Sequence, residues 1–267
     1  MKALITRADD CGSFHAANEA ILEAAEAGFI KNVSIMACGE YLEEAAEMLS
    51  RRKDICFGLH GCINSEWDRV LWGPVAPKEK VSSLIDGRGV FYQTPEELNR
   101  HSPALEEIIT EYRYQLDHAR KVGFEISYMD SHMFPEMHIP GLSEEMSRLM
   151  ETEGLIDHKW YNRIVPGNDL FISKPHLFEE TLSRIEGQYL FIMHPAKDKE
   201  EMRMTGNKDI SGEAVARARE LDYRFLTDQQ NAAWCERYKV KLLRYDEAVK
   251  GQDKKMFDPE DFRRTID

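Results

Sequence analysis

Short apolar runs alternate along the chain with longer segments in which apolar residues recur at helical spacing. The short runs predict β-strands, and the longer segments predict amphipathic helices. The expected strands are Ala3–Ile5, Val33–Ala37, Cys56–Leu59, Ile126–Met129, Tyr189–Met193 and Val240–Leu243. The expected helices are Ala16–Ala27, Glu40–Arg51, Leu105–Val122, Gly141–Glu153, His176–Ile185 and Gly212–Leu221.

Strands that alternate with helices predict parallel β–α–β units. A (β/α) barrel and an open doubly wound sheet both satisfy this pattern. The length of 267 residues and the number of units favour an α/β fold of the TIM-like (β/α) barrel type, irregular or incomplete because some strands are short. Barrels of this length form single units, so we expect one domain over residues 1–267.

One long stretch, from Gly61 to about Pro95, breaks the alternation. It contains Gly73-Pro74, Gly87 and Gly89, and this density of turn-forming residues predicts an irregular loop with a small hairpin around Asp86-Gly87. Long loops inside compact domains are usually functional. We therefore expect a lid-like insertion over residues 61–95; the alternative is a surface excursion without a role.

Composition narrows the class of protein. A net charge of −13 argues against nucleic-acid binding and against docking on anionic membranes. The five cysteines are scattered, odd in number and lack a Cys-x-x-Cys motif, which favours reduced thiols over a disulfide framework. The apolar run at the N-terminus is too short for a signal peptide, and no stretch approaches the length of a membrane span. We expect a cytoplasmic protein that is neither exported nor anchored.

Carboxylates and imidazoles follow four of the predicted strands. They are Asp9 and Asp10 after the first strand, His60 after the third, Asp130 and His132 after a middle strand, and His194 after a late one. Because active sites of parallel α/β folds form at the carboxyl ends of the strands, we expect these side chains to meet at one face. Any one histidine alone would more simply be structural. Together, such ligands suit Zn²⁺, Fe²⁺, Ni²⁺ or Mn²⁺.

The two adjacent aspartates can divide the chemistry between them. One can ligate a metal while the other accepts a proton from water activated by that metal. His138 is an alternative ligand, although a loop histidine is the simpler interpretation. Trp67 and Trp72 could stack on sugar rings or serve in ordinary packing. The sequence contains no Gly-x-Ser-x-Gly elbow, Walker loop or dinucleotide fingerprint.

Four short motifs resemble, in order, those of the YdjC-like carbohydrate deacetylase family. They are Ala8-Asp9-Asp10-Cys11-Gly12, Gly58-Leu59-His60, Asp130-Ser131-His132 and His194-Pro195, and the later Arg217-Ala218-Arg219-Glu220 segment is also similar. The chain departs from the family pattern at Cys11, Met133 and Ala196, which bears on the substrate pocket.

The resemblance implies a TIM-barrel-like fold, a divalent metal ion (Mg²⁺ or Zn²⁺) and hydrolysis of an N-acetyl group from an acetylated amino sugar, such as a chitooligosaccharide. By position, Asp10, His60 and His132 would bind the metal. Asp9 would be the general base, and His194 the general acid or oxyanion partner. A homodimer is expected from the resemblance and from the prevalence of twofold assemblies.

Two other functions fit the same residues. One is a metal-dependent enzyme that acts on another small sugar or a sugar phosphate, by isomerisation or phosphoester hydrolysis. The lack of a Gly-rich phosphate loop weakens this alternative. The other is a non-catalytic module that binds carbohydrate or metal. Such a module needs no general base, so Asp9 and His194 count against it.

Overall fold

The computed structural model describes residues 1–158, 162–163 and 168–250. The strands are β1 (Lys2–Cys11), β2 (Asn32–Ile35), β3 (Cys56–Gly61), β4 (Ile126–Ser131), β5 (Ile156–Asp157), β6 (Asn162–Arg163), β7 (Gly187–Met193) and β8 (Lys241–Leu243). The α-helices are α1 (His15–Glu26), α2 (Leu42–Leu49), α3 (Pro95–Arg100), α4 (Leu105–Lys121), α5 (Leu142–Glu153), α6 (Asn168–Ser173), α7 (Pro175–Arg184), α8 (Glu200–Arg203), α9 (Gly212–Thr227) and α10 (Gln229–Arg237). Short 3₁₀ turns are η1 (Lys78–Lys80), η2 (Ser82–Leu84), η3 (Pro135–Met137) and η5 (Tyr245–Glu247).

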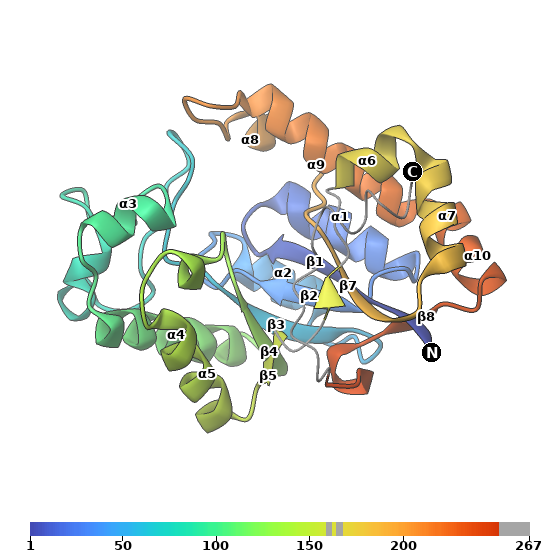
Figure 1. Ribbon diagram of the computed structural model, residues 1–267. Coiled ribbons are helices and arrows are strands. Elements are labelled where there is room, and N and C mark those ends of the chain that lie inside the picture. The colour runs from blue at the N-terminus through green and yellow to red at the C-terminus, as the bar shows by residue number, and fades with distance from the viewer. Residues whose placement is uncertain (159–161, 164–167, 251–267) are drawn as a thin grey trace.

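The strands form one curled sheet at the centre of the molecule, and the helices are arranged around it (Figure 1). Their order is β5-β4-β3-β2-β1-β7-β6, with β8 beside the first half of β1, and every pair is parallel. In the described residues the edge strands β5 and β6 do not pair with each other, so the sheet is a half-barrel. The predicted TIM-like α/β fold is thus confirmed in its incomplete form.

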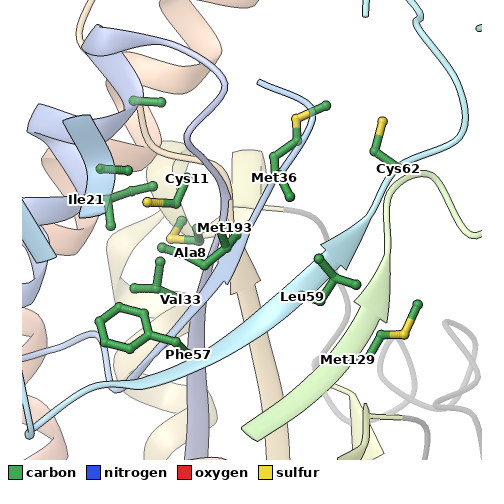
Figure 2. Packing of buried hydrophobic residues seen from close by; sticks show 14 of the residues in the cluster. Ala8, Cys11, Ile21, Val33, Met36, Phe57, Leu59, Cys62, Met129 and Met193 are labelled. Carbon is green, nitrogen blue, oxygen red and sulfur yellow. The ribbon is translucent and has the colours of Figure 1, made fainter. Parts of the chain in front are cut away.

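The sheet face that meets the helices is apolar. Figure 2 shows Ala8, Val33 and Phe57 on the same side as Ile21 of α1, and all of these side chains are buried in one hydrophobic cluster. Burial of a Val, Ile or Phe side chain contributes roughly 1.5–3 kcal/mol. This layer therefore supplies the main stabilisation that holds the helices on the sheet.

The inner face of the sheet changes from apolar to polar along the strands. Nearer the start of the strands, this face carries a second buried cluster, which consists of Ile5, Cys56, Tyr128, Leu190 and Tyr245. Side chains on a strand alternate between faces with a period of two, so residues two or four positions further along share this inner face. Those residues are Arg7 and Asp9 in β1, His60 in β3, Asp130 in β4, and His132 and His194 just beyond β4 and β7. On this inner face, apolar side chains near the start of the strands are therefore followed by a layer of polar side chains near their carboxyl ends.

Most predicted elements are present, but two differences matter. The first strand continues to Cys11 instead of ending at Ile5, so Asp9 and Asp10 lie within β1 and not after it. The pattern also missed α10 and the short elements, including the two-residue strands β5 and β6. Backbone pairing along a sheet edge defines such strands, and this pairing leaves no periodicity in the sequence.

The segment 61–95 extends from β3 to the start of α3, on the left of Figure 1 in cyan to teal. Its predicted hairpin is present as an antiparallel bridge between Ile85 and Phe91. The buried Glu111 of α4 accepts hydrogen bonds from the backbone N–H groups of Val75 (2.9 Å) and Ala76 (3.0 Å). These bonds hold the segment against α4. Its role as a lid stays a prediction.

The predicted single domain includes residues 251–267, which lie outside the described residues. Of the helices in the described part of the chain, none has the length and apolar character needed to cross a membrane.

Gly58 tests the packing of the inner face. A Cβ at this position would lie 2.2 Å from Cε2 of the buried Tyr128 ring, which packs on Tyr245 with ring centroids 4.2 Å apart. Because the ring has no room to move, we expect Gly58→Ala to lower the free energy of unfolding by about 1–3 kcal/mol, as measured in urea. Gly87→Ala, where no atom lies within 4 Å of the added Cβ, should leave stability nearly unchanged. Equal midpoints for the two variants would contradict this packing.

Candidate metal centre and active site

Three side chains, one each from β1, β3 and the residue that follows β4, meet at the carboxyl edge of the sheet. Oδ1 of Asp10 lies 3.3 Å from Nε2 of His60 and 3.5 Å from Nδ1 of His132, and these two nitrogens are 3.2 Å apart. All three residues are buried, and their ligand atoms lie within 4.8 Å of one another. Within the described structure, Oδ1 of Asp10 is buried without a hydrogen-bond partner. A cation would satisfy this acceptor, so the triad fits a divalent metal ion.

A local distortion of β1 aims Asp10 at the two histidines. Its φ angle is +66°, and the register with β2 shifts between Ala8 and Cys11. In a regular strand, Asp9 and Asp10 would point to opposite faces. Because a bulge re-aims the side chain that it carries, both carboxylates reach the same edge of the sheet. The turn that follows is closed by Ser13, whose N–H donates to the carbonyl of Asp10 at 3.1 Å.

Each imidazole of the triad is held by a carboxylate at its other nitrogen. Nδ1 of His60 contacts Oδ1 of Asp130, and Nε2 of His132 lies 3.0 Å from Oε2 of Glu66. Histidines that bind metals usually have such a partner, which sets the ring orientation and the tautomer. The contacts leave Nε2 of His60 and Nδ1 of His132 directed toward Asp10.

A second group, Asp9 with His60 and Asp130, also has the composition of a metal site. Its carboxylates, however, surround the buried guanidinium of Arg7. That group contacts both oxygens of Asp9, at 2.6 Å and 2.7 Å, and Oδ2 of Asp130 at 2.9 Å. Since the guanidinium carries a fixed positive charge, a metal cation there would be repelled. The Asp10 group is the better candidate.

Burial and charge perturb the pKa values of these groups in opposing directions. Burial acts to lower the pKa of His60, but Asp130 and Asp9 outweigh it and raise that pKa to about 10. Burial acts to raise the pKa of Asp130, yet Arg7 and His60 hold it below its usual range. For Asp9, burial dominates and raises the pKa in spite of Arg7. The three groups therefore depend on one another for their charge states.

A narrow pocket with a cavity volume of about 10 Å³ opens beside the triad. Its polar lining comes from Asp10, Ser13, Glu66, His194 and Arg219, and its apolar lining includes Phe14, Trp67, Trp72 and Met202. Nε2 of His194 lies 3.9 Å from Oδ2 of Asp9. Arg219 of α9 contacts Oδ2 of Asp10 at 2.9 Å. Carboxylate, imidazole and guanidinium groups thus border one small cavity.

The structure brings together all five residues proposed from the sequence. His138 does not join them, because it pairs with Glu96 at 3.2 Å. Arg7 and Glu66 were missed. The sequence did contain a signal for Arg7, because residues two positions apart on a strand share a face and Arg7 lies two positions before Asp9. Glu66 had none, because it follows β3 within an irregular segment.

Comparisons with known proteins find a matching family and related sequences. A family model described as YdjC-like protein matches residues 3–237. A carbohydrate deacetylase of Thermoanaerobacter pseudethanolicus is 31% identical over 139 residues, covering 52% of this chain and 53% of that protein. A mouse carbohydrate deacetylase is 30% identical over 157 residues, covering 57% of this chain and 48% of that protein. The matched stretch thus spans about half the length of these curated relatives.

Solved structures share the fold. A protein from Enterococcus faecalis V583 superposes with a TM-score of 0.72 at 21% identity, covering 92% of this chain and 98% of that chain. A family 4 carbohydrate esterase from Streptomyces lividans, in complex with acetate, has a TM-score of 0.50 at 10% identity, covering 94% and 98%. At these identities the likeness concerns the fold alone.

Removal of the Arg7 charge should destabilise the site in a pH-dependent way. Arg7→Met leaves Asp9 and Asp130 without their cation, and breaking a buried ion pair costs about 3–5 kcal/mol. The stabilisation of Asp130 by Arg7 is present above the unfolded pKa of about 3.9 and is lost as pH falls. We therefore expect the stability deficit of the variant to be large at neutral pH and to narrow in acid.

Urea unfolding curves at several pH values measure this deficit. The exposed Arg217→Met serves as the matched control, and its stability should follow that of wild type. A deficit of Arg7→Met that stays constant with pH would contradict the ion-pair explanation.

Proposed function

Because this chain belongs to the YdjC-like protein family, we propose that it is a metal-dependent hydrolase that removes an N-acetyl group from an acetylated amino sugar. One observation carries the proposal. Oδ1 of Asp10, which has no hydrogen-bond partner, faces two imidazoles, and a second carboxylate–imidazole pair, Asp9 and His194, lies nearby with His194 in the pocket lining. The family resemblance expected from the sequence is confirmed, and its curated relatives are named carbohydrate deacetylases.

Asp10, His60 and His132 would hold a divalent ion, Mg²⁺ or Zn²⁺ in our proposal. When bound, such an ion supplies Lewis-acid polarisation of an acyl carbonyl and of a water molecule. Asp130 and Glu66 keep the two imidazoles oriented for this task through their contacts at the far ring nitrogens.

Asp9 is our candidate for the general base. Burial raises its pKa above the ordinary carboxyl value, which makes the carboxylate a stronger proton acceptor. The two contacts from Arg7 fix the plane of the carboxylate. Asp9 would take the proton of the attacking water.

His194 is our candidate for the general acid. Its side chain is 39% exposed and lines the pocket, and its backbone N–H is held by Asp222 at 2.9 Å. An amine is a poor leaving group until it is protonated. A proton delivered from Nε2 of His194 would allow the carbon–nitrogen bond to break.

The chemistry of the pocket lining, and not its volume, favours a small acylated sugar that would contact the pocket at its opening. Trp67 and Trp72 supply apolar ring surfaces, and Asp10 and Arg219 supply polar groups to the same lining. The adjacent base and acid candidates favour hydrolysis over a binding module, which would need neither. The homodimer and the cytoplasmic location expected from the sequence stay predictions.

Acetate release from N,N′-diacetylchitobiose tests the proposed activity directly. We expect release that depends on added divalent metal and stops after chelation. Asp9→Asn should lower turnover by about 10²–10⁴-fold, the usual contribution of general base catalysis, while the protein still binds metal. Asp117→Asn, a change at an exposed aspartate of α4, should leave turnover unchanged.

Two results would count against this function. Full activity in Asp9→Asn would show that another group is the base. No acetate release by wild-type protein with Mg²⁺ or Zn²⁺ bound would exclude this acetylated disaccharide as a substrate.

Metal affinity should rise with pH. The pKa of His60 is raised to about 10, and a metal ion binds only a ring nitrogen that carries no proton, so protons and metal compete at this residue. We expect the Kd for Zn²⁺ to fall between about pH 6 and pH 8, with proton release. Calorimetric titration in buffers of different ionisation enthalpy counts the released protons. An affinity independent of pH would show that protons and metal do not compete at His60.

A further inference from the structure

We infer that Glu66 is a positioning residue for the metal centre and that it links metal binding to the segment 61–95. The inference rests on the metal site of the proposed function. Its starting point is that Glu66 belongs to this segment and not to the sheet that carries the three candidate ligands.

The contact between Glu66 and His132 is direct and buried. Oε2 of Glu66 lies 3.0 Å from Nε2 of His132, and Glu66 is only 7% exposed. The opposite nitrogen of the same ring, Nδ1, faces Asp10 at 3.5 Å. A hydrogen bond from Nε2–H to the carboxylate therefore sets both the tautomer and the rotation that direct Nδ1 at the metal site.

The two candidate imidazole ligands differ in the origin of their support. His60 is held by Asp130, a residue of β4 that Arg7 and Ser34 also hold in place. That support lies wholly within the sheet. His132 depends instead on Glu66, so only this ligand is sensitive to the position of the segment.

Contacts on both sides fix the backbone around Glu66. The Glu66 carbonyl accepts a hydrogen bond from Nδ2 of Asn207 at 3.1 Å, and the N–H of Asp68 donates to the carbonyl of Gly206 at 2.9 Å. These partners belong to the loop between α8 and α9. Toward the other side, the N–H of Ser65 donates to the carbonyl of Tyr92 at 2.8 Å. Glu66 is thus in place only when the segment is docked.

The same segment forms one wall of the pocket through Glu66, Trp67 and Trp72. Its docking therefore closes the pocket and completes the support of His132 together. If docking strengthens metal binding, metal binding must strengthen docking by the same factor, because coupling between two equilibria is reciprocal.

Titration of Co²⁺ into the metal-free protein measures the effect on the site. We expect Glu66→Ala to weaken Co²⁺ binding by about 10–100-fold and to alter the visible absorption bands of the bound ion. Glu66→Gln should recover part of the affinity, since its amide oxygen accepts the same hydrogen bond. Glu79→Gln makes the same charge change at an exposed position of the segment and should match wild type.

Hydrogen exchange distinguishes the proposed link from a purely structural role of Glu66, which would not make protection of the segment depend on the metal. In wild-type protein, saturating Co²⁺ should slow exchange at the N–H groups of Ser65 and Trp72, which are donors within the docked segment. In Glu66→Ala, Co²⁺ at saturation should give little such protection. Protection equal to that of wild type would overturn the link between the metal and the segment.

The outcomes separate this inference from the function beneath it. If wild-type protein binds no Co²⁺, the proposed metal site fails and the inference falls with it. If wild-type protein binds Co²⁺ and both Glu66 variants have the same Kd for Co²⁺ and the same visible spectrum as wild type, only the inference about Glu66 is overturned. Should Glu66→Ala not fold, Glu66→Gln decides: weakened binding supports the positioning role and unchanged binding refutes it.

Discussion

The buried guanidinium of Arg7 is the interaction on which the polar layer of the half-barrel depends. It lies between Asp9 and Asp130 and also donates to the hydroxyl of Tyr245 at 3.1 Å. Two carboxylates could not stay ionised at this depth without a cation between them. Asp130 in turn contacts His60. The orientation of this candidate metal ligand therefore depends on the positive charge of Arg7.

The bulge in β1 decides how the two aspartates are used. Asp9 keeps the alternation of the strand and stays with Arg7, whereas Asp10 leaves it and faces two imidazoles. A left-handed backbone at a non-glycine residue costs of order 1–3 kcal/mol and persists where the surroundings impose it. Both carboxylates contact an arginine, but Arg7 takes both oxygens of Asp9, whereas Arg219 takes only Oδ2 of Asp10. Oδ1 of Asp10 is left directed at the two imidazoles, and our proposal assigns the metal to it.

The segment 61–95 belongs to the site as much as the sheet does. It brings Glu66 to His132 and two tryptophans to the pocket, while Glu111 of α4 holds its far part. The strand ends therefore present the candidate ligands, and in our inference the segment completes the support of His132 through Glu66.

The sequence by itself determined the parallel α/β architecture, because strand and helix periodicities are local properties of the chain. It also placed Asp9, Asp10, His60, His132 and His194 at one edge, since the carboxyl ends of parallel strands must meet there. It could not reveal the bulge at Asp10, the Glu66–His132 contact or the approach of Arg219 to Asp10. Only the tertiary structure decided these, because each depends on strand register or on residues far apart in the chain, and neither leaves a local pattern.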